Sequence, residues 1–288
     1  MITFDKLGAY GRLGNQLFQY ATLKALSLKR GYEFKIPPQA NMKWHGQDSL
    51  MHEFNITAEE YTPEEYKQIN KKYIEPTWRT IDENFFNLPD NTNIEGFFQT
   101  IWYFDVFEEE IKKELTPKNK HVLDAKKYVN DLKNKYPDHE IVSLHIRRGN
   151  VVEDASMKDH FIKYYEVDGD YFKYLEQAKA VYKDNKVKFL VFSGGAKWDE
   201  NNETEIDWCK RHLIGDEYIF SEQGLPIEDF TRIMVSDHNI LSPSSSYGWW
   251  AAYLNQNPDK IIVAPKVYLV PEPDYRKHMF YPDDYILL

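Results

Sequence analysis

In the stretch IVSLHIRRGN, residues 141–150, a segment with the pattern of a β-strand is followed directly by a charged turn. Its first six residues are mostly apolar, which is typical of a buried strand in a parallel sheet, and two arginines and a glycine follow at once. Downstream, apolar runs of strand length alternate with helical patterns. We expect strands at 141–146, 187–193, 217–220, 239–242 and 260–265, and helices at 170–182, 203–212, 226–236 and 246–255. This alternation predicts a doubly wound α/β domain.

Upstream, the chain opens with another strand, loop, helix and strand. A short strand at 2–4 leads into a loop with glycines at 8, 11 and 14, and a helix over 15–30 is expected to end at Gly31. Its apolar residues predict a buried helix: Leu17, Phe18, Ala21, Leu23, Ala25, Leu26 and Leu28. A strand at 32–36 completes the unit, which is of the kind that builds a parallel sheet.

The middle of the chain is less regular. Residues 37–93 are polar and rich in turn formers, with weak helical patterning at 62–73. We then expect a strand at 94–100, amphipathic helices at 105–115 and 121–135, and a linker at 135–140. The chain is therefore expected to form two α/β domains, residues 1–136 and 137–288.

Composition restricts the class of protein. With 36 Lys and Arg against 46 Asp and Glu, the net charge of −10 argues against a nucleic-acid-binding surface. Cys209 is the only cysteine, which excludes an internal disulfide, suits a reducing compartment and suggests a buried thiol. No stretch has the roughly 18 apolar residues that a membrane span requires. We expect a soluble cytoplasmic protein.

Polar residues follow three of the expected strands, at the edge where open α/β sheets bind ligands. Arg147 and Arg148 follow the first strand, Ser193 with Gly194 and Gly195 follows the second, and residues 242–246 (SPSSS) follow the fourth. A guanidinium fork and the N-terminus of a helix both suit phosphate oxygens. Each feature alone also fits a surface ion pair or a capping serine, but together they predict a diphosphate site.

Four motifs carry a family resemblance: GRLGNQLFQYA, IEGFFQT, VSLHIRRGN and SPSSSYGWWAAYLN, in this order. They resemble the motifs of glycosyltransferase family 11, the α-1,2-fucosyltransferases, over almost the whole chain. The resemblance implies a GT-B fold, with two Rossmann-like domains facing a cleft. The first domain would lie on the acceptor side, and the second would bind the nucleotide sugar. It also implies inverting transfer of L-fucose from GDP-fucose to the 2-hydroxyl of a galactose in a glycan acceptor.

The resemblance also assigns roles to residues. Arg147 would bind the β-phosphate and stabilise the leaving diphosphate, with His145 shaping the pocket. Gly11, Gly14 and Asn15 would let the first domain approach the donor, although Asn15 also fits a plain N-cap. The remaining residues expected to bind the donor are Arg148, Ser193, Ser244, Ser245, Ser246, Tyr247 and Gly248.

Two positions depart from the family pattern. Asn150 stands where the family has Asp, and FSGG at 192–195 stands where it has FSDD or similar. Asn150 cannot act as a general base, so Glu153, Asp154 or a carboxylate of the first domain would deprotonate the acceptor, unless the reaction needs no strong base. The departures leave open a different GDP-sugar, or a nucleotide-sugar-binding protein that has lost turnover.

A metal site is considered at Asp168 and Asp170, whose spacing matches a carboxylate pair that binds Mn²⁺ or Mg²⁺ in another glycosyltransferase fold. Asp170 reads better as the N-cap of the following helix. With Arg147 and a helix N-terminus neutralising the diphosphate, we expect no metal and no other cofactor. A cytoplasmic enzyme could also lie peripherally on a membrane that carries its acceptor.

Overall fold

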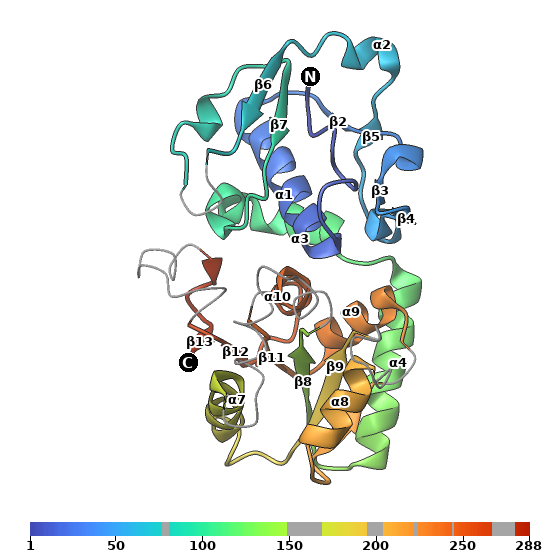
Figure 1. The fold of residues 1–288 in the computed structure, drawn as a ribbon, viewed down its shortest axis with the longest axis vertical. Coiled ribbons are helices and arrows are strands. Elements are labelled where there is room, and N and C mark those ends of the chain that lie inside the picture. Colours follow the sequence, from blue (N-terminus) through green and yellow to red (C-terminus); the bar gives the residue numbers. More distant parts are fainter. Residues whose placement is uncertain (77–80, 149–168, 195–203, 222–223, 244, 267–279) are drawn as a thin grey trace. The chain divides into compact units, whose positions relative to one another are not determined.

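The computed structural model describes residues 1–76, 81–148, 169–194, 204–221, 224–243, 245–266 and 280–288 (Figure 1). The chain divides into two compact units, Met1–Lys118 with Glu272–Asp283, and Asn119–Pro271 with Asp284–Leu288. No helix of the described residues is both long enough and apolar enough to cross a membrane. Each unit contains one parallel sheet.

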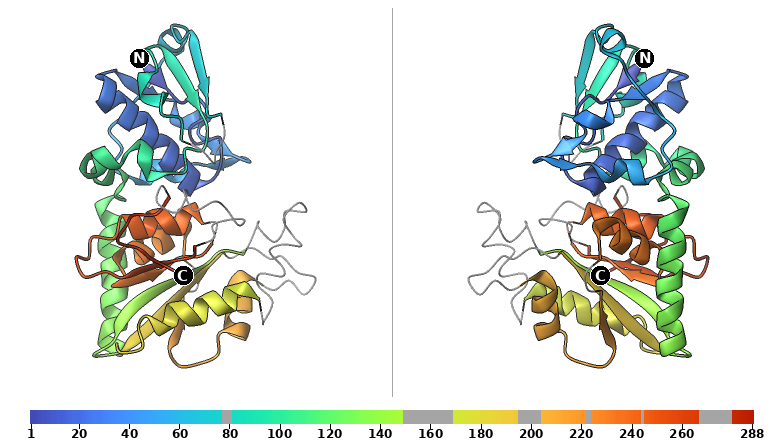
Figure 2. Two further views of the ribbon diagram at one scale, coloured as in Figure 1. Left: turned by 90° about the vertical axis from the view of Figure 1, so that its left-hand side faces the viewer. Right: turned by 90° about the vertical axis from the view of Figure 1, so that its right-hand side faces the viewer.

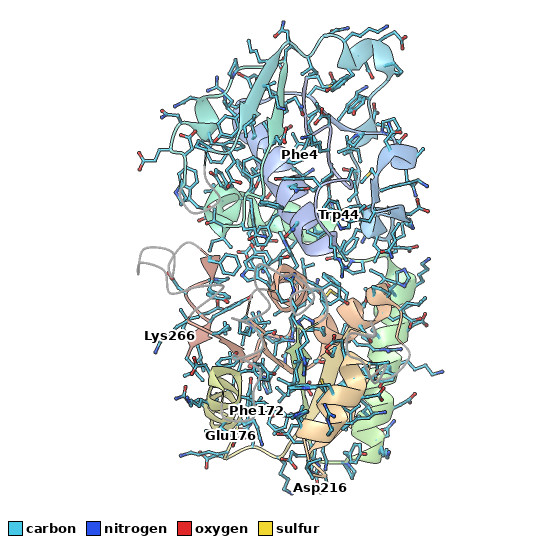
Figure 3. The ribbon with its side chains drawn as sticks, in the orientation of Figure 1. Phe4, Trp44, Phe172, Glu176, Asp216 and Lys266 are labelled. Atoms are coloured by element: carbon cyan, nitrogen blue, oxygen red, sulfur yellow. The ribbon has the colours of Figure 1, made fainter. Side chains whose placement is uncertain are left out.

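The sheet of the first unit has the strand order β5-β2-β1-β7-β6, and every neighbouring pair is parallel. Its strands are β1 (Ile2–Thr3), β2 (Phe34–Ile36), β5 (Glu59–Glu60), β6 (Lys71–Ile74) and β7 (Thr92–Glu95). A separate hairpin of β3 (Lys43–Trp44) and β4 (Gln47–Asp48) carries Trp44, which is labelled in Figure 3. The helices are α1 (Leu13–Arg30), α2 (Pro63–Tyr66) and α3 (Glu108–Leu115), with 3₁₀ turns at Gln39–Asn41, Leu50–Glu53, Phe85–Asn87, Ile101–Tyr103 and Asp105–Phe107.

Helix α1 forms the core of this unit. Its residues from Leu13 to Ser27 are almost all buried, as expected, and Gly31 ends it in the left-handed conformation at φ 67°. Leu28 is an exception, because it lies in the last turn and is 41% exposed. The apolar surface therefore covers the body of the helix and stops one turn before its end.

Two expected elements of the first unit differ from the structure. Helical patterning at 62–73 yields a single turn, α2, followed by strand β6, which pairs with β7. The strand expected at 94–100 stops at Glu95. Beyond it the backbone turns, with Phe98 at φ 49°, and Glu75 Oε2 accepts hydrogen bonds from the N–H groups of Phe97 and Phe98.

The sheet of the second unit has the order β10-β9-β8-β11-β12-β13, again all parallel. Its strands are β8 (Glu140–Ile146), β9 (Val187–Ser193), β10 (Tyr218–Phe220), β11 (His238–Ile240), β12 (Ile262–Ala264) and β13 (Ile286–Leu287). The helices are α4 (Asn119–Lys135), α7 (Asp170–Ala180), α8 (Glu205–His212), α9 (Pro226–Val235) and α10 (Ser246–Tyr253). The expected alternation of strands and helices is confirmed, and Cys209 is buried in the core, as expected.

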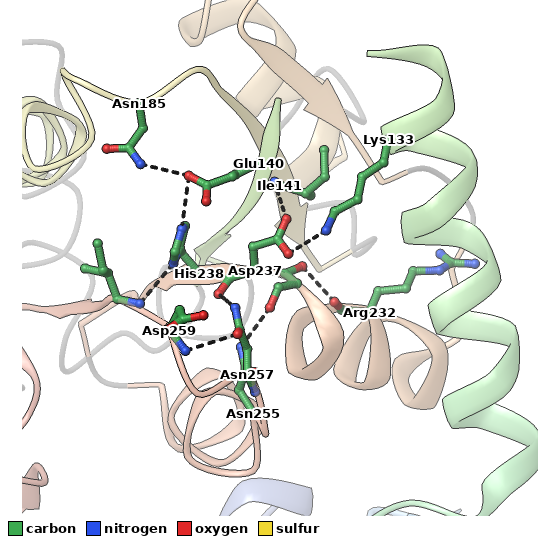
Figure 4. A network of polar contacts seen from close by, with 12 residues as sticks. Lys133, Glu140, Ile141, Asn185, Arg232, Asp237, His238, Asn255, Asn257 and Asp259 are labelled. Atoms are coloured by element: carbon green, nitrogen blue, oxygen red, sulfur yellow. Dashed lines mark hydrogen bonds and ion pairs between the residues drawn. The ribbon is translucent and has the colours of Figure 1, made fainter. Parts of the chain in front are cut away.

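Helix α4 belongs to the second unit, so the division falls at residue 118 rather than at the expected 136. Figure 2 shows this helix, in green, lying along the second unit. Lys133 Nζ donates to Asp237 Oδ1 at 2.6 Å, and Asp237 Oδ2 accepts from the N–H of Ile141 at 2.8 Å (Figure 4). The guanidinium of Arg232 lies 4.2 Å from the ring centre of Tyr128. These contacts attach α4 to the second sheet and to α9.

Candidate active site

The second sheet reverses its direction of winding between β8 and β11. The chain passes from β8 to β9 and β10 on one side, and then returns to β11, β12 and β13 on the other. Ligands of open α/β sheets bind outside the carboxyl ends of the two strands at such a switch point. At this point the backbone N–H of Arg147 donates to Ser242 Oγ at 2.9 Å. The residues that follow β8 and β11 are therefore brought together, as the sequence predicted.

Arg147 is half-buried and directly follows the buried strand β8. A guanidinium stays charged at every relevant pH and can bind two oxygens of a phosphate through its planar fork. Its position at the end of a central strand is well suited to an anion.

His145 lies two residues earlier and packs against the start of α10. It is only 9% exposed, and burial together with the positive charge of Arg147 lowers the pKa of its imidazole to about 3. Its Nδ1 atom has no hydrogen-bond partner among the described residues. A Cβ atom at Gly248 would lie 2.6 Å from this nitrogen, so the glycine permits the close approach. The imidazole is therefore neutral and adds no charge beside Arg147.

Helix α10 begins with buried serines. Ser245 is its N-cap and accepts a hydrogen bond from the N–H of Gly248 at 3.2 Å, and Ser246, its first residue, is 6% exposed. The large side chains of Trp249 and Trp250 are fully buried and anchor the helix. The N-terminus of a helix has a partial positive charge, so this end of α10 suits a phosphate.

Tyr247 has a different contact from the expected one. Its hydroxyl donates to the carbonyl oxygen of Pro226, the first residue of α9, and burial raises the pKa of the phenol well above its usual value. Its ring packs against Phe230 at 5.3 Å between ring centres. Tyr247 therefore joins α10 to α9, and a direct contact with the donor stays a prediction.

Arg148 also lies differently from what was expected of a phosphate ligand. It is 3% exposed, its guanidinium carbon lies 3.6 Å from the ring centre of Trp208, and its Nε lies 3.5 Å from Glu205 Oε2. Glu205 is itself fully buried at the start of α8. These contacts make Arg148 part of the wall between β8 and α8. We assign it a positioning role, and its contact with the donor stays a prediction.

Ser193 ends β9 and donates its hydroxyl hydrogen bond to the carbonyl oxygen of Ile146 at 2.8 Å. This bond fixes the carboxyl ends of β8 and β9 against each other. Gly194 follows as an exposed residue.

A polar cluster at the end of β10 was missed by the sequence reasoning. Ser221 Oγ donates to Asp229 Oδ1 at 2.8 Å, and Arg232 Nη1 lies 3.2 Å from both of these oxygens. Burial raises the pKa of the Asp229 carboxyl. Ser221 directly follows β10, so the rule that polar residues at strand ends form sites would have indicated it.

In the first unit the glycine loop is held by buried amides. Gln16 Nε2 donates to the carbonyl oxygens of Gly8 at 3.2 Å and Gly11 at 2.8 Å. Gly11 has φ 87°, and a Cβ atom there would lie 2.6 Å from Asn15 Nδ2. Gln19 Nε2 likewise donates to the carbonyl oxygen of Tyr10 at 2.8 Å. The sequence reasoning missed both glutamines, although a buried Gln in an otherwise apolar helix was a usable signal.

Asn15 is not the N-cap of α1, because the helix begins at Leu13 and Arg12 precedes it with extended backbone. Gly14 and Asn15 are the second and third residues of the helix. Asn15 Oδ1 accepts a hydrogen bond from Gln99 Nε2 at 2.7 Å. Two of the motifs quoted from the sequence, GRLGNQ and IEGFFQT, therefore meet at this bond.

Some predicted residues lie outside the described part of the chain: Asn150, Glu153, Asp154, Asp168, Gly195 and Ser244. Asp170 is described, and it is the first residue of α7 rather than its N-cap, which is Gly169. Across the described residues, no group of three or more His, Cys, Asp or Glu side chains could hold a metal ion.

Comparison with known proteins places the chain in a family. The model of the family described as "Glycosyl transferase family 11" matches residues 3–279. Galactoside alpha-(1,2)-fucosyltransferase 1 of Mus musculus is 29% identical over 256 residues, covering 85% of this chain. This chain spans 61% of the length of that relative. Alpha-1,2-colitosyltransferase of Escherichia coli is 27% identical over 281 residues, covering 88% of this chain and 89% of that protein.

Solved structures support the same fold. The crystal structure of POFUT1 in complex with GDP-fucose matches with a TM-score of 0.53 at 13% sequence identity, covering 91% of this chain and 97% of that one. At this identity the match concerns the fold, which agrees with the two parallel α/β sheets described above. The chain has a GT-B fold of two Rossmann-like units and belongs to glycosyltransferase family 11.

Proposed function

We propose that this protein is an inverting glycosyltransferase that transfers L-fucose from GDP-fucose to the 2-hydroxyl of a galactose residue in a glycan. The observation that carries the proposal is the position of Arg147 at the switch point between β8 and β11, bonded through its backbone to Ser242. Family membership and the names of the relatives support the same reaction.

Arg147 and the N-terminus of α10 act on the leaving group. The acceptor oxygen attacks the anomeric carbon of the sugar, the bond from this carbon to the β-phosphate oxygen breaks, and the electron pair remains on GDP. Negative charge therefore grows on the diphosphate as the reaction proceeds. A preorganised cation contributes most when charge develops beside it, and losing such a contact reduces the rate by about 100-fold or more.

The acceptor hydroxyl must lose a proton when the new bond forms. Glu153 and Asp154 follow the site in sequence and are our candidates for the base. The imidazole of His145 is neutral and adds no positive charge beside Arg147. We also propose that the reaction needs no metal ion, because a guanidinium and a helix N-terminus already neutralise the leaving diphosphate.

A second candidate donor is another GDP-sugar. The relative from Escherichia coli is named for transfer of colitose, which is fucose without its 3-hydroxyl. Asn150 and the FSGG segment depart from the fucosyltransferase pattern, which favours testing this donor. The same departures motivate a third possibility, a binding protein without turnover.

The cellular location belongs to the same proposal. The chain has a single cysteine, which is buried and cannot form an internal disulfide, and this suits the reducing cytoplasm. The acceptor then reaches the protein from the cytoplasmic side, free or attached to a membrane.

The test compares nucleotide sugars directly. Thermal unfolding is measured with GDP-fucose, GDP-colitose, GDP-mannose and UDP-galactose, because a ligand that binds the folded state raises the Tm. Transfer to methyl β-D-galactoside is then measured, and the product linkage is determined by NMR. We expect GDP-fucose to give an α-1,2 product. Transfer from GDP-colitose alone would move the proposal to the second donor, and binding without transfer or hydrolysis would support the third possibility.

A further inference from the structure

The first unit has a switch point of its own, between β1 and β7. The chain continues from β1 to β2 on one side of the sheet, and β7 lies on the other side. The glycine loop follows β1, and residues 96–99 follow β7. By the same rule as in the second unit, the ends of these two strands form the ligand-binding edge of the sheet.

An aromatic pair joins the two segments at this edge. Tyr10 of the glycine loop and Phe97 have ring centres 4.7 Å apart and planes inclined by 18°, so the rings are stacked. Both residues are half-buried, which leaves part of each accessible to solvent. Two half-exposed aromatic side chains at this edge of the sheet offer apolar surface to a ligand.

Buried and half-buried side chains hold the backbone at both aromatic residues. Gln19 is fully buried, and its Nε2 donates to the carbonyl oxygens of Tyr10 at 2.8 Å and Gly96 at 3.3 Å. Glu75 Oε2 accepts from the N–H of Phe97 at 2.8 Å. The pair is therefore preorganised, and a ligand that binds it loses little free energy in ordering the protein.

Polar groups flank the rings. Lys6 Nζ lies 5.8 Å from the ring centre of Tyr10 and donates to Glu95 Oε1 at 2.5 Å. Glu95 Oε2 also lies 2.8 Å from Lys72 Nζ. Phe97 stacks on the ring of Tyr10 and Lys6 lies over that ring, so the face of Phe97 turned away from Tyr10 is the one open to stacking. An aromatic face beside charged donors and acceptors matches a pyranose, which presents C–H groups on one face and hydroxyls at its rim.

We propose that Tyr10 and Phe97 form the platform on which the sugar ring of the acceptor stacks, a terminal β-galactoside. This assignment rests on the proposed function, since it gives the first unit the acceptor of that reaction. Galactose is suited to the platform because its axial 4-hydroxyl leaves the C–H groups at positions 3, 4 and 5 together on the opposite face.

The test measures acceptor and donor kinetics separately. For Tyr10→Ala and Phe97→Ala, we expect the KM for methyl β-D-galactoside to rise about 10-fold or more, as for the loss of one aromatic stacking contact. The KM for the nucleotide sugar and its slow hydrolysis without acceptor should stay within twofold. Tyr10→Phe keeps the ring and should retain the wild-type acceptor KM.

Tyr32→Ala is the matched control, because this half-buried tyrosine lies before β2, at the opposite edge of the same sheet. An acceptor KM within twofold of wild type in both Tyr10→Ala and Phe97→Ala would overturn the platform. Binding is also measured without catalysis, by saturation-transfer NMR with methyl β-D-galactoside. A signal in wild type that is lost in Phe97→Ala supports the platform even if no GDP-sugar is turned over. Equal signals in both proteins, or no signal in wild type, would contradict it.

Discussion

The backbone N–H of Arg147 donates a hydrogen bond to the side chain of Ser242, 95 residues away in the chain. Arg147 follows β8 and Ser242 follows β11, so the bond joins the two loops at the switch point of the second sheet. Ser242 is 2% exposed, which protects the bond from water. The hydrogen bond therefore fixes the backbone from which the arginine side chain extends.

Gly248→Ala tests the contact between His145 and α10. The new Cβ atom would lie 2.6 Å from His145 Nδ1, so either the ring or the helix must move. We expect a loss of about 1–3 kcal/mol in the free energy of unfolding, together with weaker GDP binding. Gly194→Ala is the control, because its Cβ atom meets nothing closer than Glu205 Cγ at 3.9 Å. Equal stability of the two variants in urea unfolding would contradict the close packing.

His145 should make the stability of the protein depend on pH. Burial and Arg147 lower the pKa of its imidazole to about 3 in the folded protein, while an ordinary histidine titrates near 6.5. Between these values the unfolded chain takes up a proton that the folded protein does not. Above pH 6.5 the titration of His145 therefore does not change the free energy of unfolding. Below pH 6.5 it lowers this free energy by about 1.4 kcal/mol per pH unit, down to about pH 3.

The measurement is the free energy of unfolding against pH, for wild type and for His145→Gln. The difference between the two curves should be constant above pH 6.5 and should change steadily below it. A difference that stays constant down to pH 4 would show that His145 is not held neutral.

Gly11 and Asn15 should be linked in both stability and activity. Gly11→Ala places a Cβ atom 2.6 Å from Asn15 Nδ2, at a residue with positive φ. Gly46→Ala is the control, because Gly46 has a similar φ but its Cβ atom would have no neighbour within 4 Å. We expect only Gly11→Ala to impair transfer beyond its effect on folding. Asn15→Ala removes the bond to Gln99 and should lower stability by about 1 kcal/mol while reducing kcat/KM about 10-fold or more. Wild-type kcat/KM in Asn15→Ala would reduce the loop to a folding element.

Metal removal gives a further check. We expect full transfer activity in excess EDTA, because Arg147 and the N-terminus of α10 supply the positive charge that the leaving group requires. Loss of activity in EDTA that Mn²⁺ or Mg²⁺ restores would overturn the proposed metal independence and would return attention to Asp168 and Asp170.

The second sheet was predictable because its strands are apolar and central. The segments at 141–146 and 187–193 are buried on both faces of the sheet, so they are mostly apolar, and this pattern predicts central strands of a parallel sheet. Strand β6, with the sequence KKYI, is mostly exposed at the edge of the first sheet. Its sequence does not alternate between apolar and polar residues, and its neighbours favour a helix, so periodicity alone predicted the wrong element.

The site was predictable only in part, for geometric reasons. Two consecutive arginines follow β8, and the direction of each side chain depends on the local backbone, which the sequence pattern does not give. The sequence does not tell which of them turns inward, and only the contacts of Arg148 with Trp208 and Glu205 settle its place. The partners of Asn15 and Gln19, at Gln99 and Gly96, are 84 and 77 residues away and could not be inferred from spacing.

The most direct test of the account is the kcat/KM for GDP-fucose of Arg147→Ala, with methyl β-D-galactoside as acceptor. We expect a loss of at least about 100-fold with an unchanged unfolding transition, because Arg147 follows the strand and is not part of the apolar core. Arg147→Lys should also be poor, since an ammonium group lacks the two-pronged contact of the guanidinium. Wild-type kcat/KM in a correctly folded Arg147→Ala protein would contradict the assignment of this residue to the leaving diphosphate.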